Sequence, residues 1–290
     1  MGESRQRVGF IGLGSMGGPL AGHLLAHGFP VTVYARRPEA AAGLVAAGAT
    51  AVASPREVGA SADVVCTMVT GTADVEQVLF GPDGVAAGLR PGGLVIDLST
   101  IDPEATREFA TRLASRGIAM LDAPVSGGPE GARQGTLTIM AGGPAETLEA
   151  ARPVLDAFSA RIFHMGSAGA GQVTKACHQL LLLITAEGVA ESLALASKAG
   201  VDPGAVREVM LQAMASSRVL DRFGGNMAAR NFTPGIPARL YRKDLQIVRE
   251  FADRVGAVLP GGDVVRANIA KLLEAGRGDE DLAVLITTLE

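Results

Sequence analysis

Three segments of the chain combine glycines with polar side chains in patterns that can support chemistry. The first contains G-x-G-x-x-G and can hold a dinucleotide: Gly12, Leu13, Gly14, Ser15, Met16 and Gly17. The second, Asp122 to Pro129, carries Ser126, Gly127 and Gly128 and can hold a small anion. The third, Gly169 to Lys175, leads into a long apolar helix pattern and ends on a lysine that can carry a proton. This set, in this order, predicts an oxidoreductase.

Each glycine of the first segment has its own expected purpose. Gly12 permits a tight turn, Gly14 lets the backbone approach a pyrophosphate, and Gly17 allows a helix to pack closely on a strand. The N-terminus of that helix would then face the phosphates. An expected strand at 7–11, a helix at 16–27 and a second strand at 31–34 surround the pattern. This context makes the match far more specific than the glycines alone.

The end of the second expected strand indicates which dinucleotide is bound. An NAD site usually places Asp or Glu there to bond the ribose hydroxyls. Here the residues are Ala35, Arg36 and Arg37, and a guanidinium would pair with a 2′-phosphate. We therefore predict NADP as the cofactor, with NAD as the alternative if the arginines are only solvated surface residues.

The elements that must position these segments follow two patterns. Short apolar runs at 7–11, 31–34, 62–68, 94–97 and 120–122 alternate with helix-length segments, which is typical of a parallel sheet covered on both faces. Further runs at 137–141 and 161–164 are expected to add strands. Beyond residue 169 only helices are expected, at 171–199, 203–213, 216–229, 240–255, 261–275 and 279–288.

The change of pattern predicts two domains. Residues 1–165 form an α/β Rossmann-type dinucleotide-binding domain, and residues 166–290 form an all-α substrate and dimerisation domain. One long helix that begins near Gly171 joins them. This helix is apolar on more than one face between Leu180 and Leu195, so a homodimer or homotetramer is expected.

Composition excludes several classes of protein. The 290 residues are 48% hydrophobic and 19% charged, with a net charge of −4, so neither a disordered chain nor a basic nucleic-acid-binding face is expected. The apolar run at 180–184 is soon interrupted by Glu187 and Glu191, so no membrane span is expected. No signal peptide is expected before the first strand. Cys66 and Cys177 make no disulfide framework and suit the cytoplasm.

With these segments in place, the chain resembles the β-hydroxyacid dehydrogenases, which include 3-hydroxyisobutyrate dehydrogenase, tartronate semialdehyde reductase and the succinic and glyoxylic semialdehyde reductases. The resemblance covers essentially the whole chain through five segments: Gly9–Gly17, Asp97–Thr100, Asp122–Gly128, Gly169–Lys175 and Lys243–Leu245. It implies an NAD(P)-dependent enzyme that interconverts a small β-hydroxyacid, such as 3-hydroxyisobutyrate, and its semialdehyde by hydride transfer, without a metal. The sequence does not indicate which acid.

The resemblance also implies residue roles. Lys175 is the general acid and base, and Ser126, Gly127 and Gly128 hold the substrate carboxylate. Ser99 is expected near the nicotinamide, with Phe232 and Asp244 close to the cofactor residue Lys243. The remaining residues expected at the cofactor are Met68, Val69, Thr70 and Thr100, with Thr70 in the place of the family's usual Pro.

The chain departs from the family three residues after the lysine, where His178 replaces the usual Asn. Positions i and i+3 share a helix face, so His178 should still neighbour Lys175. We expect His178 and the adjacent Gln179 to contact substrate, or His178 merely to pack.

Two rivals remain at this point. An imine reductase shares the glycine motif and the domain plan but usually carries Asp or Tyr in place of the lysine. A non-catalytic dinucleotide-binding relative would lack the lysine. A 6-phosphogluconate dehydrogenase would need a longer helical half.

His23 and His27 could form half of a metal site, but no third ligand is evident, so no metal is expected.

Overall fold

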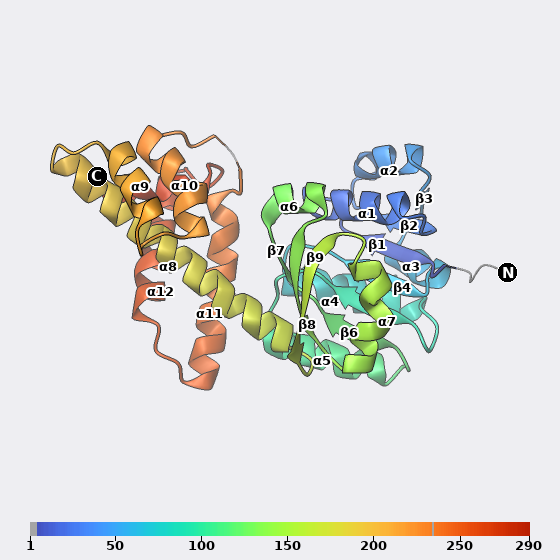
Figure 1. The fold of residues 1–290 in the computed structure, drawn as a ribbon. Helices are drawn as coiled ribbons and strands as arrows, with labels where there is room; N and C mark the ends of the chain where they lie inside the picture. Colours follow the sequence, from blue (N-terminus) through green and yellow to red (C-terminus); the bar gives the residue numbers. More distant parts are fainter. Residues whose placement is uncertain (1–4, 234) are drawn as a thin grey trace. The chain divides into compact units, whose positions relative to one another are not determined.

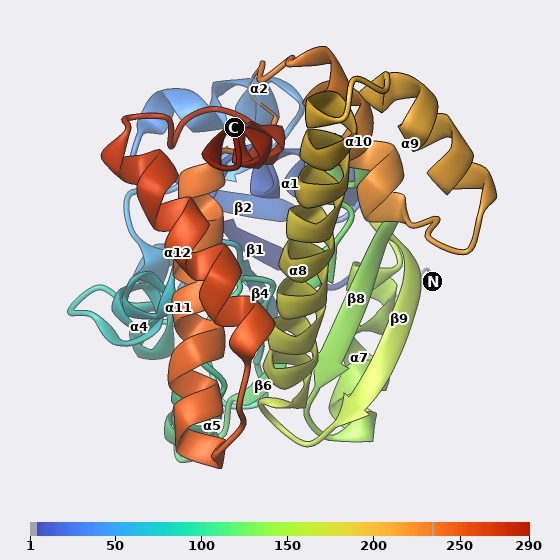
Figure 2. The same ribbon diagram turned by 90° about the vertical axis from the view of Figure 1, so that its left-hand side faces the viewer.

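The chain folds into two compact units in the computed structural model, which describes residues 5–233 and 235–290. The N-terminal unit extends to residue 175 and the C-terminal unit comprises residues 176–290. Figures 1 and 2 show the first as a sheet with helices and the second as helices only. The predicted combination of an α/β Rossmann-type part, an all-α part and a long connecting helix is confirmed.

The sheet of the N-terminal unit is mostly parallel. Its strand order is β3-β2-β1-β4-β5-β6-β8-β7, and β9 pairs with β8. Strand β8 runs antiparallel to β6 and β7, whereas the remaining pairs are parallel. The strands are β1 (Val8–Ile11), β2 (Val31–Tyr34), β3 (Thr50–Ala51), β4 (Val64–Thr67), β5 (Leu94–Asp97), β6 (Ala119–Asp122), β7 (Val125–Ser126), β8 (Leu137–Gly142) and β9 (Ser159–Gly166). The two-residue strands β3 and β7 were not predicted, because two residues show no periodicity.

Helices cover both faces of this sheet because alternate strand residues point to opposite sides. Phe10 belongs to one apolar cluster and Ile11 to the other. The first cluster receives α1 (Gly17–Ala26), α2 (Ala42–Ala46), α6 (Gly128–Gln134) and α7 (Ala145–Leu155). The second receives α3 (Pro55–Ser61), α4 (Thr72–Phe80) and α5 (Pro103–Ala114). Two short 3₁₀ helices, η1 (Pro38–Ala41) and η2 (Val85–Ala87), complete the unit.

Helix α8 (Ala170–Lys198) begins in the N-terminal unit and continues into the C-terminal one. It corrects the expectation that no segment could span a membrane, because its length and a window hydropathy of 1.6 would suffice. The two glutamates, Glu187 and Glu191, are too few to exclude a membrane span on composition alone. However, α8 carries buried polar side chains, including Gln172 and Glu187, and Glu187 accepts a hydrogen bond from Asn268. These features are typical of a core helix in a soluble protein.

The C-terminal unit packs its helices around the end of the chain. The elements are α9 (Pro203–Gln212), α10 (Arg218–Ala229), α11 (Ala238–Val255), α12 (Pro260–Glu274) and the 3₁₀ helix η3 (Leu282–Thr288). Helices α11 and α12 lie side by side (Figure 2). Asp202 caps α9 by accepting from the backbone N–H of Gly204.

The helix predicted at 279–288 is a shorter 3₁₀ helix, Leu282–Thr288. Asp281 accepts from the backbone N–H of Ala283, and a 3₁₀ helix begins at Leu282. The five residues from Leu282 to Ile286 are all fully buried. A segment buried on every side has no amphipathic period, so the pattern alone could not identify its helix type.

Candidate active site

The turn between β1 and α1 is so tightly packed that two of its glycines admit no side chain. A Cβ at Gly12, where φ is +97°, would lie 2.2 Å from the Met68 carbonyl oxygen. A Cβ at Gly17 would lie 1.9 Å from the Gly12 carbonyl oxygen. The turn therefore packs directly against the loop that follows β4. Leu13 and Met16 pack on the core, whereas Ser15 is exposed.

Gly14 differs from its neighbours because a Cβ there would meet nothing within 4 Å. Its side of the turn is open, beside a helix that starts at Gly17 without a side-chain cap or an acidic residue in its first turn. The N–H groups of a first turn attract anions. An open glycine beside such a helix end fits the pyrophosphate of a dinucleotide.

The end of β2 carries the residues expected to distinguish NADP from NAD. Ala35 is half-buried, and Arg36 and Arg37 are exposed. Arg36 Nη1 lies 3.9 Å from Asp74 Oδ1 of α4, and the arginine side chain is 82% exposed. An exposed ion pair at that distance contributes little stability, so Arg36 can turn toward a phosphate.

The loops after β4 and β5 are tied together by a buried carboxylate. Asp97 Oδ1 accepts from the Thr67 hydroxyl at 2.8 Å and from the Ser99 N–H at 3.2 Å. The Val69 N–H donates in turn to Ser99 Oγ at 3.0 Å. Ser99 and Asp97 thereby hold the two loops that carry Met68, Val69, Thr70 and Thr100. Met68, Val69 and Thr100 are half-buried, and Thr70 is exposed.

Asp97 itself is fully buried, and the sequence analysis assigned it no role. Burial, with a smaller contribution from the charge of nearby Asp122, raises the pKa of Asp97 to about 6, although the hydrogen bonds from Ser99 and Thr67 lower it. Its Oδ2 atom is buried and has no hydrogen-bond partner among the described residues. A charged carboxylate in this position destabilises the fold.

Asp122, at the end of β6, fixes the start of α8. Its Oδ1 accepts from the Gly169 N–H at 2.8 Å and its Oδ2 from the Gln172 N–H at 2.9 Å. These N–H groups lie at the cap and third positions of the helix, the two that a capping box satisfies. A Cβ at Gly171 would lie 2.3 Å from the Met140 carbonyl oxygen, so glycine there lets the helix start approach the sheet. Burial raises the pKa of Asp122, although these N–H bonds oppose the shift.

The side chain of Gln172 makes a second connection between α8 and the sheet. Its Oε1 accepts from the Ile101 N–H at 3.1 Å, and its Nε2 donates to the Ser99 carbonyl at 2.8 Å. The residue is 1% exposed. Sequence reasoning missed Gln172, and its place inside the Gly169–Lys175 segment was the only signal.

Lys175 lies one turn further along α8 and is buried. Its Nζ donates to the Val125 carbonyl at 2.9 Å, and its residue exposure is 7%. Val125 directly precedes Ser126 in β7, so the structure brings Lys175 to the strand that carries the expected carboxylate site. Gly127 and Gly128 follow with φ of +137° and +62°. A Cβ at Gly127 would also lie 2.8 Å from Leu137 Cδ2, so glycine is required there.

Four residues of the C-terminal unit form one polar network. Gln179 Oε1 is 3.0 Å from His178 Nδ1, and Gln179 Nε2 donates to Asp244 Oδ2 at 2.5 Å. Lys243 Nζ lies 3.0 Å from Asp244 Oδ1. Because Oε1 is an acceptor, His178 carries a proton on Nδ1 in this arrangement. Asp244 thus joins the two residues expected at the substrate to the one expected at the cofactor.

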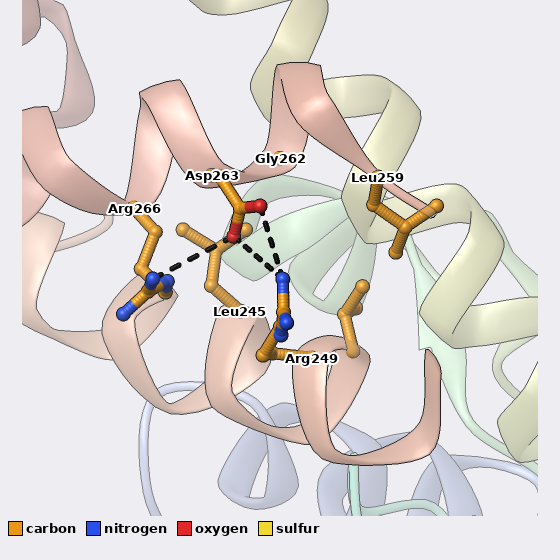
Figure 3. Close-up of a pocket in the computed structure, with 7 residues that line it drawn as sticks. Leu245, Arg249, Leu259, Gly262, Asp263 and Arg266 are labelled. Atoms are coloured by element: carbon orange, nitrogen blue, oxygen red, sulfur yellow. Dashed lines mark hydrogen bonds and ion pairs between the residues drawn. The ribbon is translucent and has the colours of Figure 1, made fainter. Parts of the chain in front are cut away.

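A small pocket lies between α11 and α12, and none of the candidate site residues lines it (Figure 3). Arg249 Nη1 lies 3.0 Å from both carboxylate oxygens of Asp263, and Arg266 Nη2 lies 3.5 Å from Asp263 Oδ1. The ion pairs fill the polar side of the pocket, and Leu245, Val248 and Leu259 line the rest. We assign the pocket a packing role.

The remaining histidines and cysteines have structural surroundings. His23 Nε2 lies 3.1 Å from the Ala132 carbonyl oxygen and joins α1 to α6. His27 Nδ1 lies 2.8 Å from the His23 carbonyl oxygen. Cys66 is fully buried, which raises its pKa to about 12, and Cys177 is exposed. Within residues 5–233 and 235–290, no group of three or more His, Cys, Asp or Glu side chains is placed to hold a metal ion.

Two family models together match nearly the whole chain. Residues 7–166 match the NAD binding domain of 6-phosphogluconate dehydrogenase. Residues 169–289 match the NAD-binding domain of NADP-dependent 3-hydroxyisobutyrate dehydrogenase. Solved imine reductases share the fold at lower identity; the one from Myxococcus stipitatus with NADP⁺ is 20% identical, with a TM-score of 0.67, which shows the fold alone.

Individual relatives agree with the family models. An NAD-dependent L-serine dehydrogenase of Pseudomonas aeruginosa is 39% identical over 97% of this chain and 96% of its own length. A 3-hydroxyisobutyrate dehydrogenase of the same organism is 42% identical over 89% of each chain. The structure of Mycobacterium tuberculosis 3-hydroxyisobutyrate dehydrogenase with L-serine is 34% identical, with a TM-score of 0.91 and 99% of each chain covered. The chain therefore belongs to the β-hydroxyacid dehydrogenase family and is an NAD(P)-dependent oxidoreductase of hydroxyacids.

Proposed function

We propose that the protein is an NADP-preferring dehydrogenase that interconverts a small β-hydroxyacid and its semialdehyde, with Lys175 as general acid and base. The observation that carries this proposal is the buried Lys175 ammonium, bonded to the Val125 carbonyl one residue before Ser126. In this proposal the proton carrier and the anion site are neighbours within the N-terminal unit. The presence of this lysine argues against an imine reductase or a non-catalytic relative.

The residues divide the chemistry between them. Ser126 donates its hydroxyl and Gly127 and Gly128 their N–H groups to the substrate carboxylate. Lys175 gives a proton to the carbonyl oxygen during reduction and removes it from the hydroxyl during oxidation. A bound nicotinamide dinucleotide would supply or accept the hydride. His178 and Gln179 contact the remainder of the substrate.

The cofactor residues are proposed as one set. The turn at Gly12, Leu13, Gly14, Ser15, Met16 and Gly17 holds the pyrophosphate. The ribose and its 2′-phosphate would be held by Ala35, Arg36 and Arg37. The nicotinamide end would be held by Met68, Val69, Thr70 and Thr100, and Lys243 would add a cation. The preference for NADP is supported by the exposed arginines at the end of β2 and by the match of residues 169–289 to a domain of NADP-dependent 3-hydroxyisobutyrate dehydrogenase.

We further propose a cytoplasmic homo-oligomer that requires no metal and binds neither nucleic acid nor membrane. Residues 1–165 act as the dinucleotide-binding domain and residues 166–290 as the substrate and dimerisation domain. The buried polar side chains of α8 support its role as a core helix.

Lys175→Ala tests the assignment of the proton carrier. The variant should fold and bind NADPH, and kcat should fall by about 10²–10⁴, the usual contribution of general acid–base catalysis. Lys198→Ala is the matched control, because Lys198 is exposed at the far end of the same helix. NADPH oxidation is followed spectrophotometrically, and activity of Lys175→Ala within a few-fold of wild type would refute the role.

The substrate is identified by a panel. NADPH oxidation is measured with glyoxylate, succinic, tartronate and methylmalonate semialdehydes, and NADP⁺ reduction with 3-hydroxyisobutyrate and L-serine. The same panel is run on His178→Asn. A changed ranking of substrates supports contact between His178 and the substrate, whereas identical rankings would contradict it.

A further inference from the structure

We propose that Gln172 is a positioning residue for Lys175, which it fixes by locking the first turn of α8 to the loop after β5. The inference rests on the proposed role of Lys175 as general acid and base. Gln172 lies three residues before the lysine, on the same face of the helix, and is 1% exposed. It is too deeply buried to contact solvent, so its side-chain amide must find its hydrogen-bond partners within the protein.

The Gln172 amide is satisfied at both ends by the backbone around Thr100. Its Oε1 accepts from Ile101 N–H and its Nε2 donates to the Ser99 carbonyl, at 3.1 and 2.8 Å. The side chain therefore pairs with the loop as a neighbouring strand would. One residue thereby holds both the loop of Thr100 and the start of the helix.

The backbone of Gln172 is fixed as well. Its N–H donates to Asp122 Oδ2, and the Gly169 N–H donates to Asp122 Oδ1. The first turn of a helix normally has unpaired N–H groups and frays readily. Here the turn is held by two hydrogen bonds to Asp122 and by two hydrogen bonds of the Gln172 amide. Both contacts lie within the turn that precedes Lys175.

This arrangement determines where the lysine ammonium points. Lys175 Nζ reaches the Val125 carbonyl at 2.9 Å only while the first turn stays in place. A displacement of about 1 Å in a reacting group lowers rates by about 10²-fold. Loss of the Gln172 contacts should therefore reduce kcat while the bound substrate and cofactor keep most of their affinity.

Gln172→Glu gives a readout that a packing role would not produce. The new carboxylate has the shape of the amide, and one oxygen still accepts from Ile101 N–H. Its other oxygen faces the Ser99 carbonyl and repels it unless it is protonated. At pH 8 we expect kcat to fall by about 10–100-fold, with KM values within about threefold of wild type. As the pH is lowered, the glutamic acid regains the donor, and kcat should recover relative to wild type.

Hydrogen exchange supplies a measurement that does not depend on turnover. In the cofactor-free protein, Gln172→Met keeps the side-chain volume but removes both hydrogen bonds. Amides of residues 169–175 should exchange at least about tenfold faster, whereas those of 190–198 should not change. Gln246→Glu, a change at an exposed glutamine of α11, serves as the control.

A double-mutant cycle separates this inference from the proposed function. If Gln172 acts through Lys175, Gln172→Glu should cause no further loss of kcat in the Lys175→Ala background. A further loss of tenfold, or unchanged kcat in Gln172→Glu alone, would overturn the inference. Full activity of Lys175→Ala alone would instead overturn the proposed function, whatever the Gln172 variants do.

Discussion

Arg36 is the residue on which the choice of cofactor depends. Its guanidinium is exposed and only loosely paired with Asp74, so it is available to a 2′-phosphate. Arg36→Ala should raise the KM for NADPH by about tenfold or more and leave the KM for NADH nearly unchanged. Asp74→Asn removes the competing carboxylate and is the control, for which NADPH should bind as well or better. Equal kinetics of the wild type with NADPH and NADH would contradict the role of Arg36.

Asp97 should make the stability of the protein depend on pH. Its pKa in the folded state, about 6, is above the ordinary value of 3.8, so the folded state binds the proton more tightly than the unfolded state does. The free energy of unfolding should therefore fall as the pH rises from about 4 to about 6. The difference amounts to about 3 kcal/mol.

Asp97→Asn removes this titration. The amide oxygen can still accept from Thr67 and Ser99, and no charge is buried at neutral pH. Urea-unfolding midpoints measured from pH 4 to pH 8 should fall less in the variant than in the wild type. Asp156→Asn, at an exposed carboxylate after α7, should leave the wild-type slope unchanged. Parallel slopes in Asp97→Asn and wild type would show that Asp97 does not titrate in this range.

At the scale of the element, two glycines of the turn between β1 and α1 should serve different purposes: Gly17 the stability of the fold and Gly14 the binding of the cofactor. Gly17→Ala places a methyl group 1.9 Å from the Gly12 carbonyl oxygen, so it should destabilise the fold by about 2–4 kcal/mol. Gly14→Ala meets open space and requires no left-handed backbone, so stability should stay within about 1 kcal/mol. We expect Gly14→Ala instead to weaken the binding of NADPH by about tenfold or more.

These glycine variants are compared by thermal unfolding and by calorimetric titration with NADPH. Gly14→Ala with undiminished affinity would show that the open side of the turn does not face the cofactor. Unchanged stability of Gly17→Ala would show that the helix can move away from the strand without loss.

The elements that could be predicted are those whose signals are local. The strands at 31–34 and 94–97 agree to the residue, and α8 begins one residue before the predicted Gly171. Lys175 could be identified because its glycine lead-in is contiguous in sequence. Gln172 could not, because its partners Ser99 and Ile101 lie 73 and 71 residues away. Such pairings arise only when β5, β6 and α8 are brought together by the sheet.

At the scale of the whole molecule, α8 leaves an apolar stripe uncovered. Leu181 and Leu195 are 68% and 70% exposed, and Ile184 and Gly188 lie between them on the same side. Exposed stripes of this kind mark association surfaces. We predict that light scattering will find a homo-oligomer and that Leu195→Glu will shift it toward monomer without unfolding it. Val209→Glu, at an equally exposed valine of α9, should remain assembled. A wild-type monomer at micromolar concentration would refute the prediction.

The division between the two units falls inside an unbroken helix, and this restricts how such a protein can be recombined or engineered. A chimera of two relatives joined at 175/176 must preserve the helical phase as well as the reading frame. One inserted residue after Lys175 would turn every later residue of α8 by about 100° and advance it by about 1.5 Å. His178 would then stand four residues after the lysine and not three, on the opposite side of the face that the two residues share. Four inserted residues nearly complete a turn, so insertions in α8 should be tolerated, if at all, with a period close to that of the helix.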